Sequence, residues 1–271
     1  MRGSAPAKIN LGLVVGPLRD DGKHEVLTVY QRIALADRID VDPAPQLGVA
    51  GFAEDTLVRG ALEALAERVG VEPRWGVRIE KRLPVAAGIG GGSSDAATAL
   101  RLANAQLEQP LNATALHELA ARLGADVPFF LREGPQLGSG DGTTLEPVDV
   151  PQDFWIVLLL PHDMQKESTG AVYRAFDERD GAAGWEERAQ QLRDAVAGAR
   201  RPRDLARLPP NDLAQSPHSV RLRELGAFHA DVSGAGPSVY GLFHHRAHAD
   251  AARKALKPAG RTWLTAPAWY G

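Results

Sequence analysis

A cluster of glycines followed by two serines is the part of this sequence best suited to bind a ligand. It lies in PVAAGIGGGSSDAATAL, residues 84–100, and continues into an alanine-rich stretch typical of a helix. Glycine allows a backbone to take positive φ and to approach a phosphate closely. The first turn of a helix adds unpaired N–H groups and the positive end of the helix dipole. With Ser93, Ser94 and Asp95 expected at the N-cap, this segment predicts an anion site.

The glycine cluster differs from the two best-known nucleotide fingerprints. A dinucleotide-binding G-x-G-x-x-G motif would need a third glycine where Ser93 stands. A Walker A loop ends in Gly-Lys-Ser or Gly-Lys-Thr, whereas the one Gly-Lys pair of the chain, Gly22-Lys23, precedes His24. A tight turn without a ligand is the alternative interpretation, since glycine marks turns in general.

A lysine, an asparagine and an aspartate are further candidates for chemistry. Lys8 and Asn10 stand two residues apart, which places both on one face of an otherwise apolar strand. A solvated edge strand would explain them equally well. Asp126 precedes the apolar residues 127–130, and a carboxylate in such surroundings must be paired or hydrogen-bonded, or its pKa rises. An aspartate at a helix end or in an Asx-turn is the alternative.

A second turn of small residues lies in SGAGPSVYGLF, residues 233–243, between two strand patterns. A plain hairpin explains this segment on local grounds. Phosphoryl transfer, however, requires a phosphate cradle, positive charge and a group that orients a hydroxyl. Two glycine-rich loops, a lysine on a strand and an isolated aspartate supply those parts together.

The composition favours a globular protein without structural cysteine chemistry. The chain has 271 residues, 44% of them hydrophobic, and a net charge of -3, which gives no general field for nucleic acid. It has no cysteine, so disulfides and thiolate nucleophiles are excluded. No apolar run reaches the length of a membrane span, and MRGSAPAKIN lacks the apolar region of a secretory signal, so we expect a cytoplasmic protein.

Hydrophobic periodicity predicts two halves. In the first half we expect strands over residues 7–15, 26–33, 38–41 and 77–79, and helices over 57–69 and 114–123 that end at Gly70 and Gly124. In the second half we expect a helix over 185–196 and a loop over 200–210. Around them we expect the order strand 154–160, helix 219–226, strands 228–232 and 239–243, helix 247–256 and strand 262–265. This β-α-β-β-α-β order is the ferredoxin-like arrangement. With a boundary near 147–151, the predicted domains are 1–148 and 149–271.

Four segments together resemble the GHMP kinase superfamily, and within it the kinases of 4-diphosphocytidyl-2-C-methyl-D-erythritol. These segments are PAKINLGLVV, PVAAGIGGGSSDAATAL, LGADVPFF and SGAGPSVYGLF, and the resemblance extends over nearly the whole chain. It implies an α+β fold with an N-terminal ribosomal protein S5 domain 2-like domain and a C-terminal ferredoxin-like split βαβ domain. It also implies ATP-dependent phosphorylation of the 2-hydroxyl of that compound, in the non-mevalonate isoprenoid pathway.

The resemblance assigns roles to individual residues of this chain. Asp126 is the expected catalytic carboxylate and Lys8 its partner. The expected ATP-binding residues are Pro84, Gly88, Gly90, Gly91, Gly92, Ser93 and Ser94, with Ser93 or Ser94 reaching Mg²⁺. The expected substrate-binding residues are Asn10, His24, Thr169 and Tyr173, with His24 reading the cytosine and Tyr173 stacking on it.

Two positions depart from the family pattern. Lys23 stands where the family usually has an aromatic residue, and it could supply a cation–π or a diphosphate contact instead. Thr56 stands where the family commonly has an asparagine near the adenine pocket.

Two other functions stay open from the sequence. The first is another small-alcohol GHMP kinase, of the homoserine or mevalonate type, which would have no use for His24 and Tyr173. The second is a non-catalytic nucleotide-binding protein, which would have no use for Lys8 and Asp126. In each case we expect a monomer or a homodimer that binds small molecules and neither nucleic acid nor a membrane.

Overall fold

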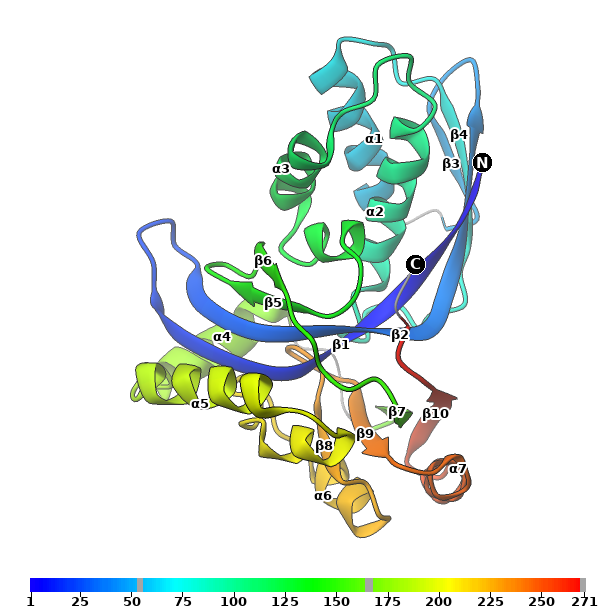
Figure 1. The fold of residues 1–271 in the computed structure, drawn as a ribbon. Coiled ribbons are helices and arrows are strands. Elements are labelled where there is room, and N and C mark those ends of the chain that lie inside the picture. The colour runs from blue at the N-terminus through cyan, green and yellow to red at the C-terminus, as the bar shows by residue number, and fades with distance from the viewer. Residues whose placement is uncertain (53–55, 164–167, 269–271) are drawn as a thin grey trace.

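Two long antiparallel strands, β1 (Arg2–Leu18) and β2 (His24–Pro43), cross the whole molecule (Figure 1). The structure is a computed structural model that describes residues 1–52, 56–163 and 168–268. The prediction of two separate strands over 26–33 and 38–41 was wrong, because β2 continues through residues 34–37 between them. Across this stretch β1 pairs with β2 through Pro6 opposite Ala36 and Ala5 opposite Asp37, and the buried Asp37 side chain is paired with Lys81.

The first sheet is built on this hairpin. Its strand order is β3-β4-β2-β5-β6, with β1 also paired to β2. The remaining strands are β3 (Gly48–Ala50), β4 (Trp75–Glu80), β5 (Gln136–Ser139) and β6 (Thr144–Pro147). The long strand β2 pairs with β5 near its start and with β4 near its end. The hairpin therefore carries β5 and β6 at one end of β2 and β4 and β3 at the other, within one sheet.

Three helices cover one face of the first sheet: α1 (Thr56–Val69), α2 (Gly91–Asn104) and α3 (Ala113–Leu123). They agree with the predicted helices, and Gly124 ends α3 as expected. A short 3-10 helix, η1 (Pro128–Leu131), follows the turn that carries Asp126. Its Phe129 is fully buried in the core beneath α2. The apolar residues after Asp126 thus fix that turn to the core by burial.

The second sheet has the strand order β10-β7-β9-β8, all antiparallel. Its strands are β7 (Trp155–Pro161), β8 (His229–Val232), β9 (Val239–Phe243) and β10 (Gly260–Thr265). The helices α6 (Pro217–Glu224) and α7 (Arg246–Ala255) pack on it. The order of these elements confirms the ferredoxin-like prediction.

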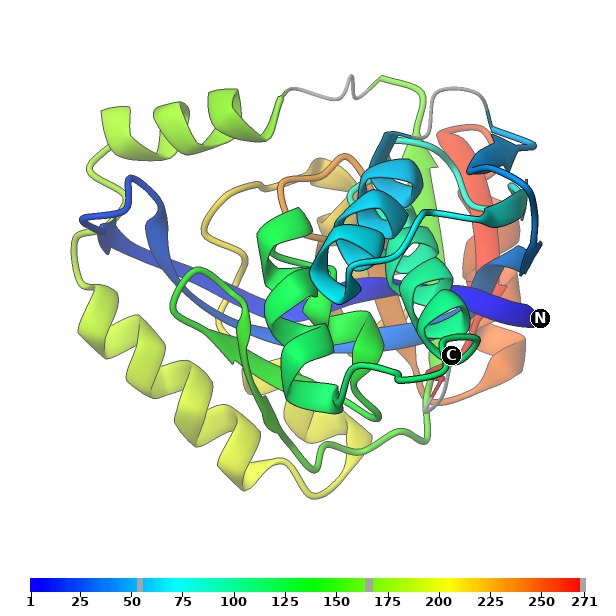
Figure 2. The same cartoon turned by 90° about the horizontal axis from the view of Figure 1, so that it is seen from above.

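Two helices inserted between β7 and β8 flank the β1–β2 hairpin (Figure 2). The helix α5 (Trp185–Gly198) agrees with its prediction, whereas α4 (Thr169–Glu178) was not predicted. Ser168 caps α4 by accepting from the backbone N–H of Ala171, a local signal that was missed. The predicted loop over 200–210 contains a 3-10 helix, η2 (Pro202–Arg207), because Pro202 supplies a favourable first helical position.

One apolar core joins both halves of the chain. It includes Ile9 and Ile33 from the hairpin, Ile156 and Leu242 from the second sheet, and Leu192 from α5. Because this core is continuous, the domain boundary at residue 148 stays a prediction.

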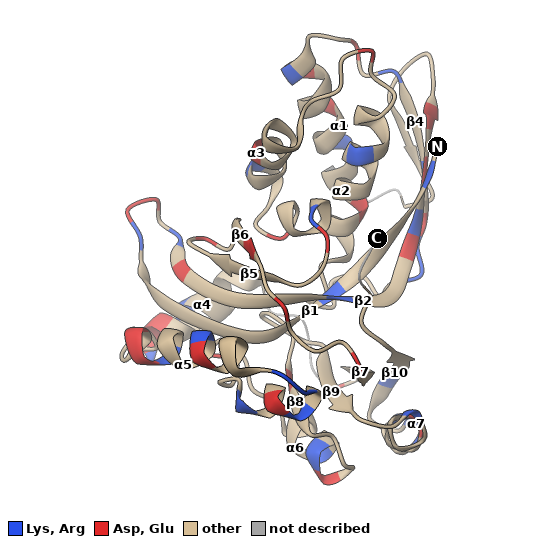
Figure 3. Ribbon diagram, in the orientation of Figure 1, with Lys and Arg blue, Asp and Glu red and all other residues tan. Residues whose placement is uncertain are grey.

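Charged residues of both signs intermingle along the surface helices, as Figure 3 shows for α5 and α6. This distribution agrees with the small net charge of the chain. Among the described helices, none is both long and apolar enough to cross a bilayer.

Candidate active site

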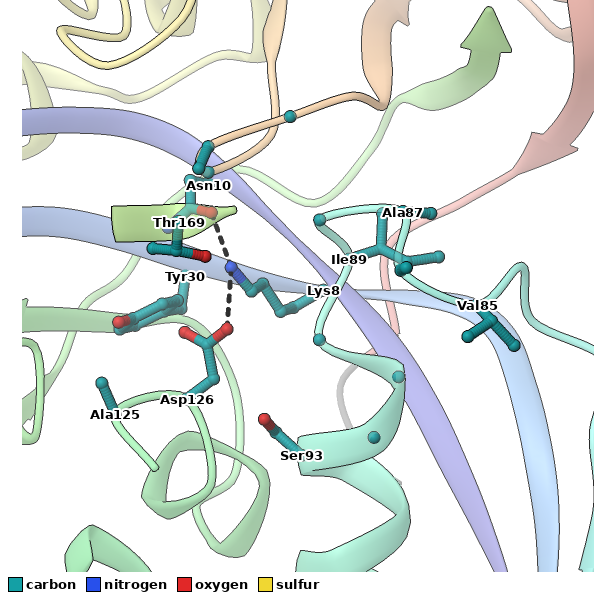
Figure 4. A pocket seen from close by; sticks show the side chains of 18 of the residues that line it. Lys8, Asn10, Tyr30, Val85, Ala87, Ile89, Ser93, Ala125, Asp126 and Thr169 are labelled. Carbon is teal, nitrogen blue, oxygen red and sulfur yellow. Dashed lines mark hydrogen bonds and ion pairs between the residues drawn. The ribbon is translucent and has the colours of Figure 1, made fainter. Parts of the chain in front are cut away.

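A cavity of about 550 Å³ lies where the first sheet, α2 and the turn between β8 and β9 meet. The segments that line it come from β1, the glycine loop (residues 84–92), the turn at 125–126, α4 and the turn at 234–236. Figure 4 shows the side chains of Lys8, Asp126 and Ser93, from β1, the turn at 125–126 and α2, directed toward one common space. Segments far apart in the sequence therefore border a single space.

The backbone conformation of the glycine loop determines where α2 begins. Gly88 has φ 75°, and Gly90 is the N-cap of α2 with φ 70°, without a capping side chain. The first intrahelical bond runs from the N–H of Ser94 to the carbonyl of Gly90. The earlier N–H groups of the first turn have no intrahelical partner, and their N-cap residue, Gly90, has no side chain to cap them. They are therefore suited to bind phosphate oxygens.

The prediction that Ser93, Ser94 and Asp95 form the N-cap was wrong. The helix begins at Gly91, and these residues lie inside it, because a left-handed glycine can start the helix earlier than a capping side chain would. Ser93 lines the cavity, whereas Ser94 is fully buried and does not. The Ser94 hydroxyl has no hydrogen-bond partner among the described residues. The remaining expected ATP-binding residues, Pro84 and the four glycines, all line the cavity.

The second turn of small residues packs directly on the glycine loop. The Ser233 hydroxyl donates to the Gly88 carbonyl at 3.1 Å, and the Ser238 N–H donates to the Ala87 carbonyl at 3.2 Å. A Cβ on Gly88 would lie only 2.4 Å from the Gly236 carbonyl oxygen. The hairpin interpretation of this segment is correct, but the turn also forms one wall of the cavity.

Lys8 and Asn10 project into the cavity from β1 (Figure 4). The Lys8 ammonium lies 3.2 Å from an Asp126 carboxylate oxygen and donates to Asn10 Oδ1 at 2.7 Å. Asn10 Nδ2 in turn donates to the Thr28 hydroxyl. Irregular pairing of β1 around Lys8 directs its N–H to the Ile89 carbonyl, so the strand also holds the glycine loop.

Asp126 is the more accessible member of this ion pair, with 30% of its side chain exposed against 4% for Lys8. The ring of Tyr30 lies beside both, with its centroid 5.4 Å from the Lys8 ammonium. Burial, and then the negative charge of Asp126, raise the pKa of Tyr30 well above its usual value. Asp126 is thus the group with room to contact a ligand hydroxyl.

A buried ion triplet supports the start of α2, and sequence reasoning missed it. Lys81 donates to Asp37 at 2.7 Å and to Asp95 at 2.6 Å, and both carboxylates are fully buried. Burial lowers the pKa of Lys81, but the two carboxylates outweigh burial and raise it overall. Lys81 is one of only six lysines in the chain and lies three residues before Pro84, the first residue of the loop, and this was the signal available in the sequence.

The structure separates the four expected substrate-binding residues into two groups. Asn10, Thr169 and Tyr173 line the cavity, whereas His24 does not. His24 stacks on Tyr173 with ring centroids 5.1 Å apart. Its ring nitrogens contact the Gly16 carbonyl at 2.9 Å and Asp177 at 3.2 Å. In this arrangement His24 supports the ring of Tyr173 from behind.

The two departures from the family pattern have different outcomes. Lys23 forms an ion pair with Asp141 at 2.6 Å, and Asp141 lines the cavity. The side chain of Thr56 lies outside the described part of the chain. No group of three or more His, Cys, Asp or Glu residues within residues 1–52, 56–163 and 168–268 is placed to hold a metal ion.

Family models match both halves of the chain. The model of the GHMP kinases N-terminal domain matches residues 56–134, and the model of the GHMP kinases C-terminal domain matches residues 221–261. Together with the two sheets and the glycine loop at α2, these matches define a GHMP kinase.

The relatives are more specific than the family models. A 4-diphosphocytidyl-2-C-methyl-D-erythritol kinase of Anaeromyxobacter dehalogenans is 38% identical over 93% of this chain and 84% of its own. The protein of the same name from Gloeobacter violaceus is 34% identical over 91% of this chain and 87% of its own. A crystal structure of 4-(cytidine 5'-diphospho)-2C-methyl-D-erythritol kinase has a TM-score of 0.79 and 32% identity, covering 98% of this chain and 99% of that one. The chain therefore belongs to the 4-diphosphocytidyl-2-C-methyl-D-erythritol kinase family.

A mevalonate kinase structure shares the fold alone. Its TM-score is 0.76 at 12% identity, over 98% of this chain and 99% of that one. The mevalonate-type alternative is thus compatible with the architecture but lacks comparable support from sequence.

Proposed function

We propose that this protein transfers the γ-phosphoryl group of ATP to the 2-hydroxyl of 4-diphosphocytidyl-2-C-methyl-D-erythritol. The observation that carries the proposal is the Lys8–Asp126 ion pair, which faces the start of α2 across one cavity. The family relationship supports the choice of acceptor. Cytoplasmic location and the monomeric or dimeric state stay predictions.

Asp126 acts on the acceptor hydroxyl. Its carboxylate accepts the hydroxyl proton while the acceptor oxygen bonds to the γ-phosphorus and the bond to the β-phosphate oxygen breaks, releasing ADP. Lys8, nearly buried 3.2 Å away, pairs with this carboxylate and offsets negative charge on the transferred group. Asn10 and Thr28 fix the ammonium by the hydrogen bonds described above.

The glycine loop and the first turn of α2 bind the triphosphate. The left-handed Gly88 and Gly90 let the backbone approach phosphate oxygens closely, and the helix dipole adds attraction for the anion. Mg²⁺ prefers phosphate oxygens, water and one or two protein oxygens. Of the two candidate serines, Ser93 fits this donor set, because its hydroxyl points toward Asp126 in the cavity while Ser94 is buried elsewhere (Figure 4). Bound Mg²⁺ would neutralise phosphate charge.

The acceptor occupies the other end of the cavity. Tyr173 and Thr169 line that end, and the Tyr173 ring is large enough to stack on a pyrimidine. Burial and then the Asp126 charge raise the pKa of Tyr173 to about 12, so it remains a neutral ring at physiological pH. In the proposed complex the cytosine stacks on Tyr173, and His24 holds that ring in place.

The test is ADP release from Mg-ATP with three acceptors in parallel: 4-diphosphocytidyl-2-C-methyl-D-erythritol, homoserine and mevalonate. Turnover with the cytidine compound alone supports the proposal, and turnover with another acceptor, or with none, rejects it. Asp126→Asn should lower kcat by two to four orders of magnitude and change ATP affinity only a few-fold. Asp194→Asn, an exposed change on α5, is the matched control and should retain full activity.

A further inference from the structure

Asp141, which is paired with Lys23, lines the same cavity as Tyr30. A Cβ on Gly142 would lie 2.9 Å from the Tyr30 hydroxyl, which places the turn at 140–142 against Tyr30. In Figure 4 the glycine loop and Tyr30 lie on opposite sides of the Lys8–Asp126 pair. Asp141 therefore borders the part of the cavity that a phosphate donor on the glycine loop leaves open.

Asp141 is held in one orientation and remains ionised. Its Oδ2 accepts from Lys23 at 2.6 Å, and its Oδ1 accepts from the Thr143 hydroxyl at 2.6 Å and from the Thr143 N–H at 3.2 Å. Burial raises the pKa of Asp141, but the hydrogen bonds from Lys23 and Thr143 outweigh burial and lower it. Only 15% of the side chain is exposed. A carboxylate has about four acceptor positions, so capacity remains for a ligand donor.

The backbone around Asp141 is tied to the β1–β2 hairpin. The Val26 N–H donates to the Gly140 carbonyl at 2.7 Å, and the Gly140 N–H donates to Glu25 at 3.1 Å. Lys23 and His24 are adjacent in sequence, and they contact Asp141 and Tyr173 respectively. The carboxylate and the stacking ring are therefore held by the same short segment and border the same space.

We propose that Asp141 determines specificity for the base of the acceptor by accepting a hydrogen bond from its exocyclic amino group. Carboxylates accept from the 4-amino group of cytosine, whereas the 4-carbonyl oxygen of uracil would face a negative charge. Lys23 is a positioning residue that keeps the carboxylate directed at the cavity. This inference rests on the proposed function, since it takes a cytidine compound as the acceptor.

The experiment compares kcat/KM for the cytidine acceptor and for its uridine counterpart, in the unaltered protein and in Asp141→Asn. Asparagine suits the same glycine-flanked turn and can serve either base. The unaltered protein should prefer the cytidine compound, and Asp141→Asn should reduce that preference at least ten-fold while KM for ATP stays within about two-fold. An unchanged preference overturns the inference.

A second variant and a binding measurement distinguish failure of this inference from failure of the proposed function. Lys23→Met should also reduce the preference, by less, because Thr143 still holds the carboxylate. Calorimetric titration with cytidine diphosphate and uridine diphosphate measures the same preference without turnover. If the protein phosphorylates neither acceptor, the proposed function fails. Equal affinities for the two diphosphates in the unaltered protein would then also reject the role of Asp141.

Discussion

Replacing Gly88 with alanine should separate the two turns that close the cavity. Gly88 has φ 75°, a region that L side chains rarely adopt. The added Cβ would lie 2.4 Å from the Gly236 carbonyl oxygen and 2.9 Å from the Ser233 carbonyl oxygen. Both neighbours are backbone atoms, so neither can rotate away, and the turn at 233–237 must move.

The size of the effect follows from these two contributions. A left-handed backbone costs a non-glycine residue about 1–2 kcal/mol. Forcing a carbon into a close-packed contact typically costs about 1–3 kcal/mol more. We therefore expect Gly88→Ala to lower the free energy of unfolding by roughly 2–5 kcal/mol. Displacement of the loop should also raise KM for ATP at least ten-fold, because the N–H groups that bind phosphate move with it.

Urea unfolding followed by tryptophan fluorescence, together with ATP kinetics, measures both effects. Gly92→Ala is the matched control, because Gly92 lies in the first turn of α2, has no positive φ, and an added Cβ meets no atom within 4 Å. It should leave the free energy of unfolding unchanged or slightly higher. If Gly88→Ala proves as stable as Gly92→Ala, the close approach of the two turns is not what fixes the glycine loop.

Three other perturbations have expected outcomes. His24→Ala should raise KM for the cytidine acceptor several-fold and leave KM for ATP nearly unchanged, because His24 supports Tyr173 away from the glycine loop; equal changes in both would indicate misfolding. Lys81→Met should lower the free energy of unfolding by about 3–5 kcal/mol in urea, since it removes the cation paired with two buried carboxylates, whereas Arg82→Met, at an exposed side chain, should change it little. Burial raises the pKa of Asp231 to about 6 from 3.8, so the folded state binds this proton more tightly than the unfolded state. Compared with Asp231→Asn, the unaltered protein should therefore gain up to about 3 kcal/mol of stability as the pH falls from 7 through 6 toward 4. Both proteins contain the other titrating groups, such as His229, whose pKa is lowered to about 4 by burial. The contributions of these groups therefore cancel when the two free energies of unfolding are subtracted. A difference that stays flat with pH would show that Asp231 keeps an ordinary pKa.

Local patterns in the sequence determined the glycine loop, most helices and the order of the second sheet. Hydrophobic periodicity and the glycines that end helices are features of a few neighbouring residues, so they can be recognised without knowing the fold. The spacing of Lys8 and Asn10 on one strand face belongs to the same kind of information, and the structure confirms that both point into the cavity. The short helix α4 was missed although its capping serine is a local signal.

Contacts between distant segments determined which charged side chains of the candidate site are paired. Nothing in the spacing of Lys8 and Asp126 fixes their 3.2 Å separation, which depends on β1 and on the packing of the apolar residues that follow Asp126. The pairing of Lys81 with two buried carboxylates and that of Lys23 with Asp141 join segments 14 to 118 residues apart. Such pairs form only when tertiary packing removes water from charges that would otherwise stay solvated, because burial is what makes an unpaired charge costly. The sequence therefore determined which chemical groups are present, and the tertiary structure decided which of them meet.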